Sequence, residues 1–260
     1  MVGQEKLKAY FKRAIENKAV PRFIMLCGAK GQGKKTFVEW LLGEMKYRSS
    51  REDALKIENI RHIKESSIAL SEKTAYLLFD ADNMTIQAQN ALLKFVEEPP
   101  RNAYIIVTAQ HEKNLLSTIS SRASVHHLAR YTATELAKFT DDKELLSMCE
   151  NPGQIRLMSG DKKREVLALA NKIKSSLSRI APANVFNILK HIEKEDYELL
   201  LNSLLYLYSQ QLIQQPNKLG CIRVIYDYKA FLNHKSLNKA NLLEMMFIKL
   251  REEELLSELR

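Results

Sequence analysis

The feature that most constrains this chain is a continuously apolar run that leads directly into a glycine-rich, basic loop. The run Phe-Ile-Met-Leu-Cys covers residues 23–27, and the loop Gly-Ala-Lys-Gly-Gln-Gly-Lys-Lys-Thr covers residues 28–36. A short apolar run that ends in glycine is typical of a buried parallel strand. The apolar spacing after the loop predicts a helix over 36–45. Strand, glycine loop and helix in this order are the context that a phosphate-binding loop requires.

The loop keeps the residues that would hold phosphate groups. Gly28, Gly33 and Lys34 stand at the spacing G-x-x-x-x-G-K-[ST], and Gly31 is a further loop glycine. Glycines let backbone N–H groups turn toward phosphate oxygens, and the dipole of the following helix favours the negative charge. Lys34 would reach the β- and γ-phosphates. We therefore predict a loop of the nucleotide-binding type.

The same loop departs from the pattern where a magnesium ligand should stand. Lys35 occupies the position of the Ser or Thr hydroxyl. An ammonium group has three donors and no acceptor, so it cannot enter a magnesium shell as a hydroxyl oxygen does. Thr36 comes one residue late, about 100° further around a helix, and is a poor substitute. We predict no metal site, and we leave open whether ATP or ADP binds here or the loop is vestigial.

Composition and charge set the class of protein. A chain of 260 residues, 45% of them hydrophobic and 27% charged, predicts an ordinary globular protein of roughly two domains. No apolar run approaches the ~18 residues of a membrane helix, and no apolar signal core stands at the N-terminus, so we expect a cytoplasmic protein with no membrane partner. The net charge of +9 favours an anionic partner such as nucleic acid, with solubility alone as the alternative.

Apolar patterning predicts an α/β region followed by an all-α region. Strands are predicted over 23–27, 75–79 and 104–107, and helices over 4–17, 36–45, 57–66 and 86–96. After His127 no further strand is indicated, and helices are predicted over 133–149, 161–175, 183–212, 219–232 and 238–259. Strands that alternate with helices argue for a parallel sheet. The change near residue 130 is the clearest domain boundary.

Two polar residues stand where predicted strands end. Asp80 follows the strand over 75–79, where a carboxylate can support a metal; capping of the next helix is the alternative. An active ATPase of this kind usually has a glutamate next, but here Ala81 follows, and Asp82 lies one residue further. Thr108 ends the third strand and could sense a γ-phosphate, although Ser and Thr are common at strand ends.

Arg122 is the remaining candidate, within the sequence Ser-Ser-Arg-Ala of residues 120–123. Its side chain can form a surface ion pair, or it can act as an arginine finger that reaches the γ-phosphate bound by a neighbouring subunit. Chemistry alone favours the surface ion pair, because arginine is rarely buried.

The motifs together resemble the bacterial DNA polymerase III clamp-loader AAA+ family, and most closely its delta-prime group. The block Asp-Ala-Asp-Asn-Met-Thr at 80–85, followed by Asn-Ala-Leu-Leu-Lys at 90–94 and Glu-Glu-Pro-Pro at 97–100, carries most of this resemblance. The stretch from 102 to 122 is similar to the segment that ends in the family's Ser-Arg-Cys motif. A weaker similarity returns over 238–251.

The resemblance implies three domains: an AAA+ nucleotide-binding α/β domain over 1–130, a helical lid over 131–176 and an oligomerising helical collar over 177–260. It also implies that Arg122 is an arginine finger acting in trans. Within the family the motor subunits hydrolyse ATP, whereas delta-prime is the silent member. Lys35, Ala81 and Gly153 match the silent member. Motor subunits carry a sensor arginine at the position of Gly153, and Arg156, one helical turn away, leaves this third point open.

The implied function is that of a non-hydrolysing subunit, within the polymerase assembly, that helps to load a sliding clamp onto primed DNA in DNA replication. Its partners would be the motor and clamp-opening subunits, the clamp and, through the complex, primed DNA. We expect no required cofactor, and no zinc, because residues 46–72 lack the cysteines of the family's zinc module. The alternatives are an active ATPase of the same fold, using Lys34, Asp80 and Thr36, and a stand-alone DNA-binding protein.

Overall fold

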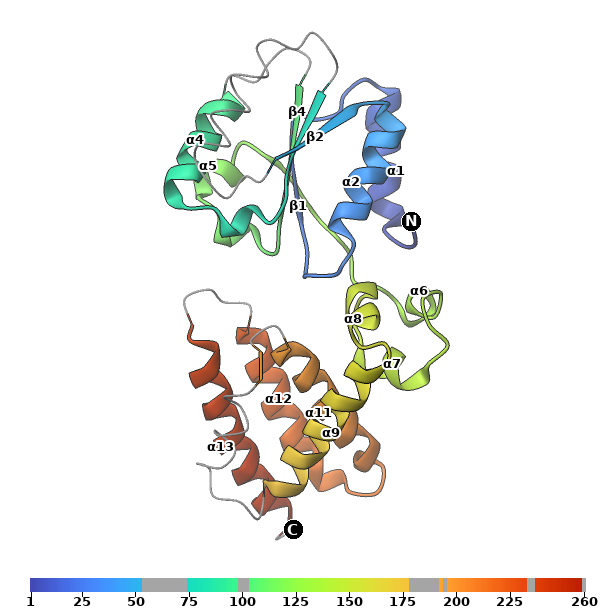
Figure 1. Ribbon diagram of the computed structural model, residues 1–260, viewed down its shortest axis with the longest axis vertical. Coiled ribbons are helices and arrows are strands. Elements are labelled where there is room, and N and C mark those ends of the chain that lie inside the picture. Colours follow the sequence, from blue (N-terminus) through green and yellow to red (C-terminus); the bar gives the residue numbers. More distant parts are fainter. Residues whose placement is uncertain (53–73, 98–102, 178–191, 194–195, 233–236, 259–260) are drawn as a thin grey trace. The chain divides into compact units, whose positions relative to one another are not determined.

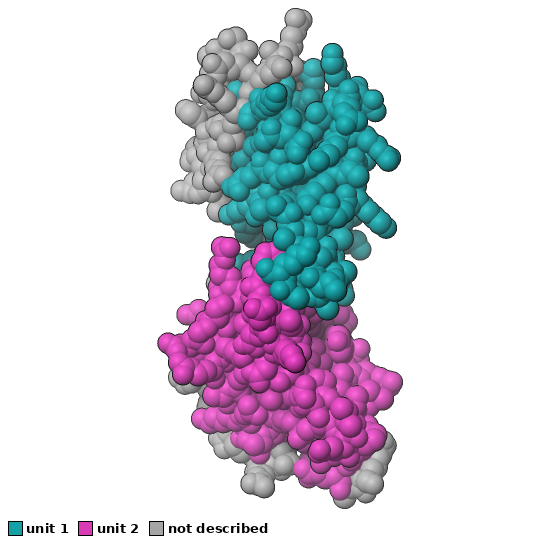
Figure 2. Space-filling view, turned by 90° about the vertical axis from the view of Figure 1, so that its right-hand side faces the viewer, with its two compact units in different colours: residues 1–138 teal, residues 139–260 magenta. Residues whose placement is uncertain are grey.

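The computed structural model describes residues 1–52, 74–97, 103–177, 192–193, 196–232 and 237–258. The chain divides into two compact units, residues 1–138 and 139–260, which Figure 2 distinguishes by colour. Each unit is described by itself. The helix predicted over 57–66, the prolines at 99–100 and most of the first half of the helix predicted over 183–212 lie outside the described residues.

The first unit is built on a parallel five-stranded sheet in the order β2-β3-β4-β1-β5 (Figure 1). The strands are β1 (Phe23–Cys27), β2 (Arg48–Glu52), β3 (Thr74–Leu78), β4 (Ala103–Ala109) and β5 (Ser124–His127). The three inner strands confirm the sequence prediction. They are continuous apolar runs because helices cover both faces of the sheet.

The edge strands β2 and β5 were not predicted. Their sequences are Arg-Ser-Ser-Arg-Glu and Ser-Val-His-His, which lack the continuous apolar run of the inner strands. Within the described part of the chain, β2 pairs only with β3, and β5 pairs only with β1. An edge strand is held mainly by backbone hydrogen bonds to its single neighbour, so its pattern of side chains carries a weaker signal.

Helices cover both faces of this sheet, with α1 and α2 on one side and α4 and α5 on the other (Figure 1). The bounds are α1 (Glu5–Glu16), α2 (Lys34–Met45), α4 (Ile86–Glu97), α5 (Ser117–Ser120) and α6 (Ala133–Leu136), with short turns η1 (Ala81–Asn83) and η2 (Glu112–Asn114). Alternate residues of β1 enter opposite cores: Met25 packs on the α4 side and Leu26 on the α2 side.

The described residues of the second unit contain helices and turns only. These are α7 (Lys143–Met148), α8 (Pro152–Leu157), α9 (Asp161–Ser176), α11 (Tyr197–Leu212), η3 (Pro216–Lys218), α12 (Leu219–Phe231) and α13 (Lys239–Glu258). One apolar core joins α9, α11, α12 and α13. No helix in the described part of the chain is both long and apolar enough to cross a membrane. The division into a lid over 131–176 and a collar over 177–260 stays a prediction.

The single helix predicted over 133–149 is wrong. Two short helices, α6 and α7, stand there instead, because each has its own N-terminal cap. The Thr132 hydroxyl accepts from the backbone N–H of Glu135, and the Asp142 carboxylate accepts from the N–H groups of Glu144 and Leu145. Ser, Thr and Asp at such positions begin a new helix rather than continue an old one.

Candidate functional site

The glycine loop lies between β1 and α2, as predicted. It is at the edge of the sheet formed by the carboxyl ends of the parallel strands. Gly31 and Gly33 have φ angles of 84° and 89°, in the left-handed region that favours glycine. A Cβ atom at Gly33 would also lie 3.2 Å from the hydroxyl of Tyr131. These two glycines are therefore required by the shape of the loop itself.

Lys34 is held inside its own loop. The side chain is buried, with 7% of its surface exposed, and Nζ donates to the carbonyl oxygens of Gly28 at 2.6 Å and Ala29 at 3.0 Å. Burial lowers the pKa of Lys34 below its usual value, and the nearby carboxylates of Asp80 and Asp82 oppose that shift. The ammonium group is placed where the motif requires it, but its partners are carbonyl groups of the loop.

Gln32, which the sequence analysis did not single out, fills the inside of the loop. Its Oε1 accepts from the backbone N–H of Ala29 at 2.7 Å, and its Nε2 donates to the carbonyls of Leu128 at 3.0 Å and Ala129 at 2.8 Å. A Cβ atom at Gly28 would lie only 2.7 Å from this Oε1. Gln32 stands at a variable position of the motif, so the sequence carried no signal for it.

Lys35 and Thr36 both lie on the exposed surface of α2. Lys35 Nζ lies 4.9 Å from the centre of the Phe79 ring, a cation–π contact. Its charge is thus directed to the end of β3 and its aromatic neighbour. Neither residue supplies a buried hydroxyl at the first turn of the helix, which is the chemistry that a magnesium-dependent loop needs.

The structure brings Asp80 and Thr108 together. The backbone N–H of Asp80 donates to the Thr108 hydroxyl at 3.0 Å, and Thr108 is almost completely buried. Asp80 has a φ angle of 55°, an uncommon conformation for a residue with a side chain. The strand β4 extends to Ala109, so Thr108 lies within it rather than directly after it. The Thr108 hydroxyl therefore has a structural partner in the Asp80 backbone.

The two residues after Asp80 point into the protein. Ala81 has no exposed surface and packs in the apolar core beside α4. Asp82 is 3% exposed, its Oδ2 is 3.5 Å from Asn114 Nδ2, and its Oδ1 has no hydrogen-bond partner. The position where a water-activating glutamate is expected is thus occupied by a core methyl group.

Arg122, by contrast, lies on the surface after α5. Its side chain is 44% exposed, its Nη2 is 3.0 Å from Oε1 of Glu97, and its Nη1 donates to the Thr118 carbonyl at 3.1 Å. Both sequence interpretations of this residue are compatible with a half-exposed guanidinium. Gly153 and Arg156 lie on α8 of the second unit, where Arg156 is exposed in the last turn.

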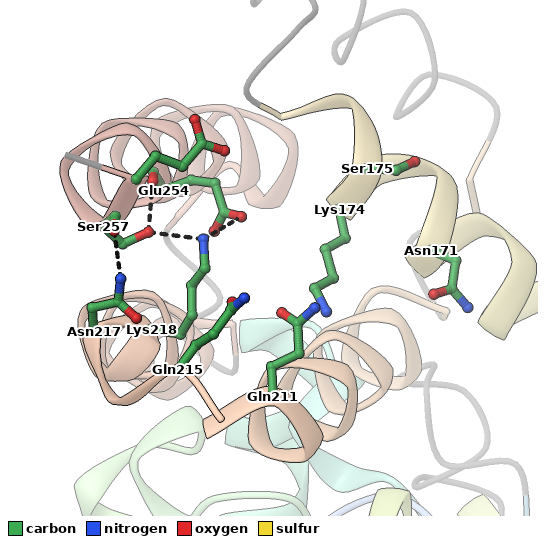
Figure 3. Close-up of a pocket in the computed structure, with 10 residues that line it drawn as sticks. Asn171, Lys174, Ser175, Gln211, Gln215, Asn217, Lys218, Glu254 and Ser257 are labelled. Carbon is green, nitrogen blue, oxygen red and sulfur yellow. Dashed lines mark hydrogen bonds and ion pairs between the residues drawn. The ribbon is translucent and has the colours of Figure 1, made fainter. Parts of the chain in front are cut away.

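The second unit holds a polar pocket of about 670 Å³ between α9, the end of α11, η3 and α13 (Figure 3). Lys218 Nζ lies 2.8 Å from a Glu254 carboxylate oxygen and 2.8 Å from the Ser257 hydroxyl. Figure 3 shows Lys174 on the facing wall, from α9. The partners come from helices far apart in the sequence, so no local pattern predicted this cluster.

A magnesium nucleotide is the group that such loops hold in other proteins, and the residues present here do not fit it as they are arranged. The Ala29 N–H and the Lys34 ammonium are bound within the protein, and Lys35 offers no acceptor oxygen. Among the described residues, no three His, Cys, Asp or Glu side chains converge in a way that could hold a metal ion.

A parallel sheet with a glycine loop after an inner strand, followed by helices, is the arrangement of a P-loop fold. The RuvB P216G mutant of Thermotoga maritima has this fold: it matches with a TM-score of 0.53 and 16% identity, over 98% of this chain and 89% of that one. At this identity the likeness shows the fold alone.

Sequence comparisons point to a family within this class. The family model for the DNA polymerase III delta subunit matches residues 42–132. The replication factor C small subunit of Methanosphaera stadtmanae is 29% identical over 150 residues, and DNA polymerase III subunit delta' of Bacillus subtilis is 42% identical over 52 residues. These alignments cover 53% and 20% of this chain, and it spans only 46% and 16% of the two relatives. These matches together support a clamp-loader AAA+ family for this chain.

Proposed function

We propose that this chain is a delta-prime-like, non-hydrolysing subunit of a clamp loader, acting in DNA replication. The observation that carries the proposal is the burial of Ala81 in the apolar core directly after Asp80. Phosphoryl transfer to water needs a group that positions the water and a metal ion that neutralises the developing charge. Ala81 cannot position water, and Lys35 cannot ligate the metal.

Arg122 is proposed to act on a site outside this chain. An arginine finger must extend from its own subunit toward a γ-phosphate bound by the neighbour. The Arg122 guanidinium is on the surface, where it pairs with the half-exposed carboxylate of Glu97 and donates to the Thr118 carbonyl. Exposed pairs of this kind contribute about 0–1 kcal/mol, so the pair can be exchanged for a stronger contact with phosphate.

The proposed partners are the motor and clamp-opening subunits of the loader, the sliding clamp and, through the assembly, primed DNA. The net charge of +9 suits a protein that works close to DNA, since basic side chains release counterions when they meet phosphates. The proposed location is the cytoplasm. In this role the subunit requires no cofactor of its own.

The test is DNA-stimulated ATP hydrolysis by a loader reconstituted from this chain with its motor and clamp-opening subunits. Arg122→Ala should leave assembly intact and lower the stimulated rate by at least roughly tenfold, because a finger stabilises charge in the transition state. Arg130→Ala is the matched control, since Arg130 is another exposed arginine of the same unit. Equal rates for both variants would refute the role of Arg122.

Two measurements on the isolated chain separate the alternatives. ATP turnover by the purified protein, abolished by Lys34→Ala, would identify an active ATPase instead. Tight DNA binding without partners, weakened steeply by salt, would identify a stand-alone DNA-binding protein. We expect neither.

A further inference from the structure

The amide group of Gln32 is fully bonded inside the loop. Its oxygen accepts from the Ala29 N–H, and its nitrogen donates to the carbonyls of Leu128 and Ala129. Gln32 is 7% exposed; its bond to Leu128 is buried, and its bonds with Ala29 and Ala129 are partly buried. Buried hydrogen bonds of this kind are costly to break unless the separated groups find new partners.

These bonds occupy the groups that a phosphate would use. Backbone N–H groups of a glycine loop bind phosphate oxygens, and here the Ala29 N–H is bound by Gln32. The Lys34 ammonium is bound by the Gly28 and Ala29 carbonyls. The Gln32 oxygen also lies directly over Gly28, where a Cβ atom would be 2.7 Å away. A phosphate chain therefore competes with Gln32 for the same backbone donor.

Gln32 also ties the loop to the segment that leaves the sheet after β5. The Ala129 carbonyl accepts from both Gln32 and Gln4 at 2.8 Å, and the Ala129 N–H donates to Gln4 Oε1 at 2.8 Å. The Tyr131 hydroxyl donates to the Gln32 carbonyl at 3.3 Å. Release of the Gln32 amide would thus free the Leu128 carbonyl, while the Ala129 carbonyl stays bonded to Gln4.

We propose that Gln32 is a built-in competitor of phosphate, which keeps the loop closed against nucleoside di- and triphosphates and couples loop opening to the segment 128–131. This deepens the proposed function, on which it rests in taking the loop as one of the nucleotide-binding type. A nucleotide binds only the fraction of molecules in which Gln32 has left the loop. The apparent affinity is lowered by that fraction.

The test compares Gln32→Ala with Gln4→Ala in the full-length chain. Both glutamines are buried and both bind Ala129, but only Gln32 binds the Ala29 N–H. Affinity for ADP and for ATP is measured by calorimetry with and without Mg²⁺. We expect Gln32→Ala to bind at least roughly tenfold more tightly than wild type, which is about 1.4 kcal/mol. Gln4→Ala should bind as wild type does.

Amide hydrogen exchange at Ala29 is the second measurement. We expect faster exchange in Gln32→Ala and unchanged exchange in Gln4→Ala, because only the first variant removes the acceptor of this N–H. Unchanged affinity in Gln32→Ala, or an equal gain in both variants, would overturn the proposal. Neither result bears on Arg122, whose role depends on the hydrolysis assay of the assembled loader, so the two proposals fail separately.

Discussion

Among the residues that the structure describes, each unit buries one lysine, and the two lysines are stabilised in opposite ways. Lys34 in the glycine loop is 7% exposed and is bound only by two carbonyl oxygens. Lys218 in the helical unit is 6% exposed and is bound by the Glu254 carboxylate and the Ser257 hydroxyl. The first charge lacks an opposite charge in contact with it, and the second has one.

This difference separates a site shaped for a ligand from a site shaped for the fold. A buried charge without a contacting counter-charge costs stability, and such groups cluster at functional sites. A buried pair with a further hydrogen bond is compensated within the protein. We therefore assign Lys34 to a loop of the nucleotide-binding type and Lys218 to the packing of η3 against α13. The predictions below test this contrast on stability.

The largest effect is expected at the compensated pair. Glu254→Leu removes the carboxylate and leaves the buried Lys218 ammonium with the Ser257 hydroxyl but no counter-charge, which should lower the free energy of unfolding by about 3–5 kcal/mol. Urea unfolding followed by circular dichroism measures it. Glu252→Leu changes an exposed carboxylate of the same helix and is the control.

A double variant makes this prediction sharper. Lys218→Met combined with Glu254→Leu removes both charges and should restore most of the lost stability, because two apolar side chains need no compensation. If the double variant is as unstable as Glu254→Leu, then lost packing rather than an unpaired charge explains the effect, and the contrast between the two lysines fails.

The second prediction concerns Lys34, where removal of the charge should have only a small effect on the free energy of unfolding. Burial lowers the pKa of Lys34 in the folded state, so the unfolded chain binds more protons between that lowered value and about 10.4. Stability contributed by this position therefore rises with pH through that window. Against Lys34→Met, wild type should gain stability as pH rises, at about 1.4 kcal/mol for each unit of pKa shift.

Chemical denaturation from pH 8 to pH 10.5 measures this difference. Lys35→Met is the matched control, since Lys35 is the exposed neighbour in the same loop. We expect the Lys35→Met curve to run parallel to wild type. A loss of several kcal/mol in Lys34→Met at pH 7 would show instead that the two carbonyl bonds of Lys34 hold the fold together.

The inner strands could be predicted from the sequence because burial on both faces of the sheet requires a continuous apolar run, which a short stretch of sequence shows. β1, β3 and β4 are apolar runs, and the loop between β1 and α2 is punctuated by Gly31 and Gly33, whose φ angles only glycine adopts easily. The edge strands β2 and β5 were not predicted, because each lies at an edge of the sheet and its sequence has no continuous apolar run. The break between α6 and α7 was not predicted, because the apolar spacing across this segment indicated a single helix despite the capping residues Thr132 and Asp142.

The sequence named candidate site residues but not their partners. Lys34 was named from the loop spacing, and Asp80 and Thr108 from their positions at strand ends; the structure brings the last two into contact. Gln32 stands at a position where the motif accepts any residue, and its partners at 128–129 lie almost a hundred residues away. Contacts of that range arise only when the sheet places the end of β5 beside the end of β1.

His126, a partly buried basic group, tests whether burial affects other basic side chains as it affects Lys34. The His126 ring packs 4.9 Å from the Tyr10 ring and 4.8 Å from the Phe11 ring, measured between centroids, and its Nε2 is 2.9 Å from the Ser124 hydroxyl. Burial, with a smaller effect of His127, lowers the pKa of His126. The unfolded chain then takes up a proton before the folded chain does, so this contribution to stability falls as pH drops below about 6.5.

His126→Phe should remove that dependence while it keeps an aromatic ring in the packing. We expect wild type to lose less than about 1 kcal/mol relative to His126→Phe between pH 7 and pH 5, since the ring is only partly buried. Thermal unfolding across this range measures the difference. His127→Gln alters an exposed ring on the same strand and should keep the pH dependence of the wild type. Identical curves for wild type and His126→Phe would contradict the role given to His126.

The smallest effect on stability is expected at Arg122. Its ion pair with Glu97 is formed by side chains that are 44% and 48% exposed, so Arg122→Ala should change the free energy of unfolding by less than about 1 kcal/mol. Glu97→Gln removes the charge of the other partner and should change the free energy of unfolding by no more than Arg122→Ala does. Urea unfolding of both variants is the measurement. A loss above ~2 kcal/mol would mean that Arg122 supports the fold, and a lower rate of hydrolysis in the assembled loader could then come from damage to the subunit. A small loss leaves contact with a neighbouring subunit as the reason for any large change in that rate.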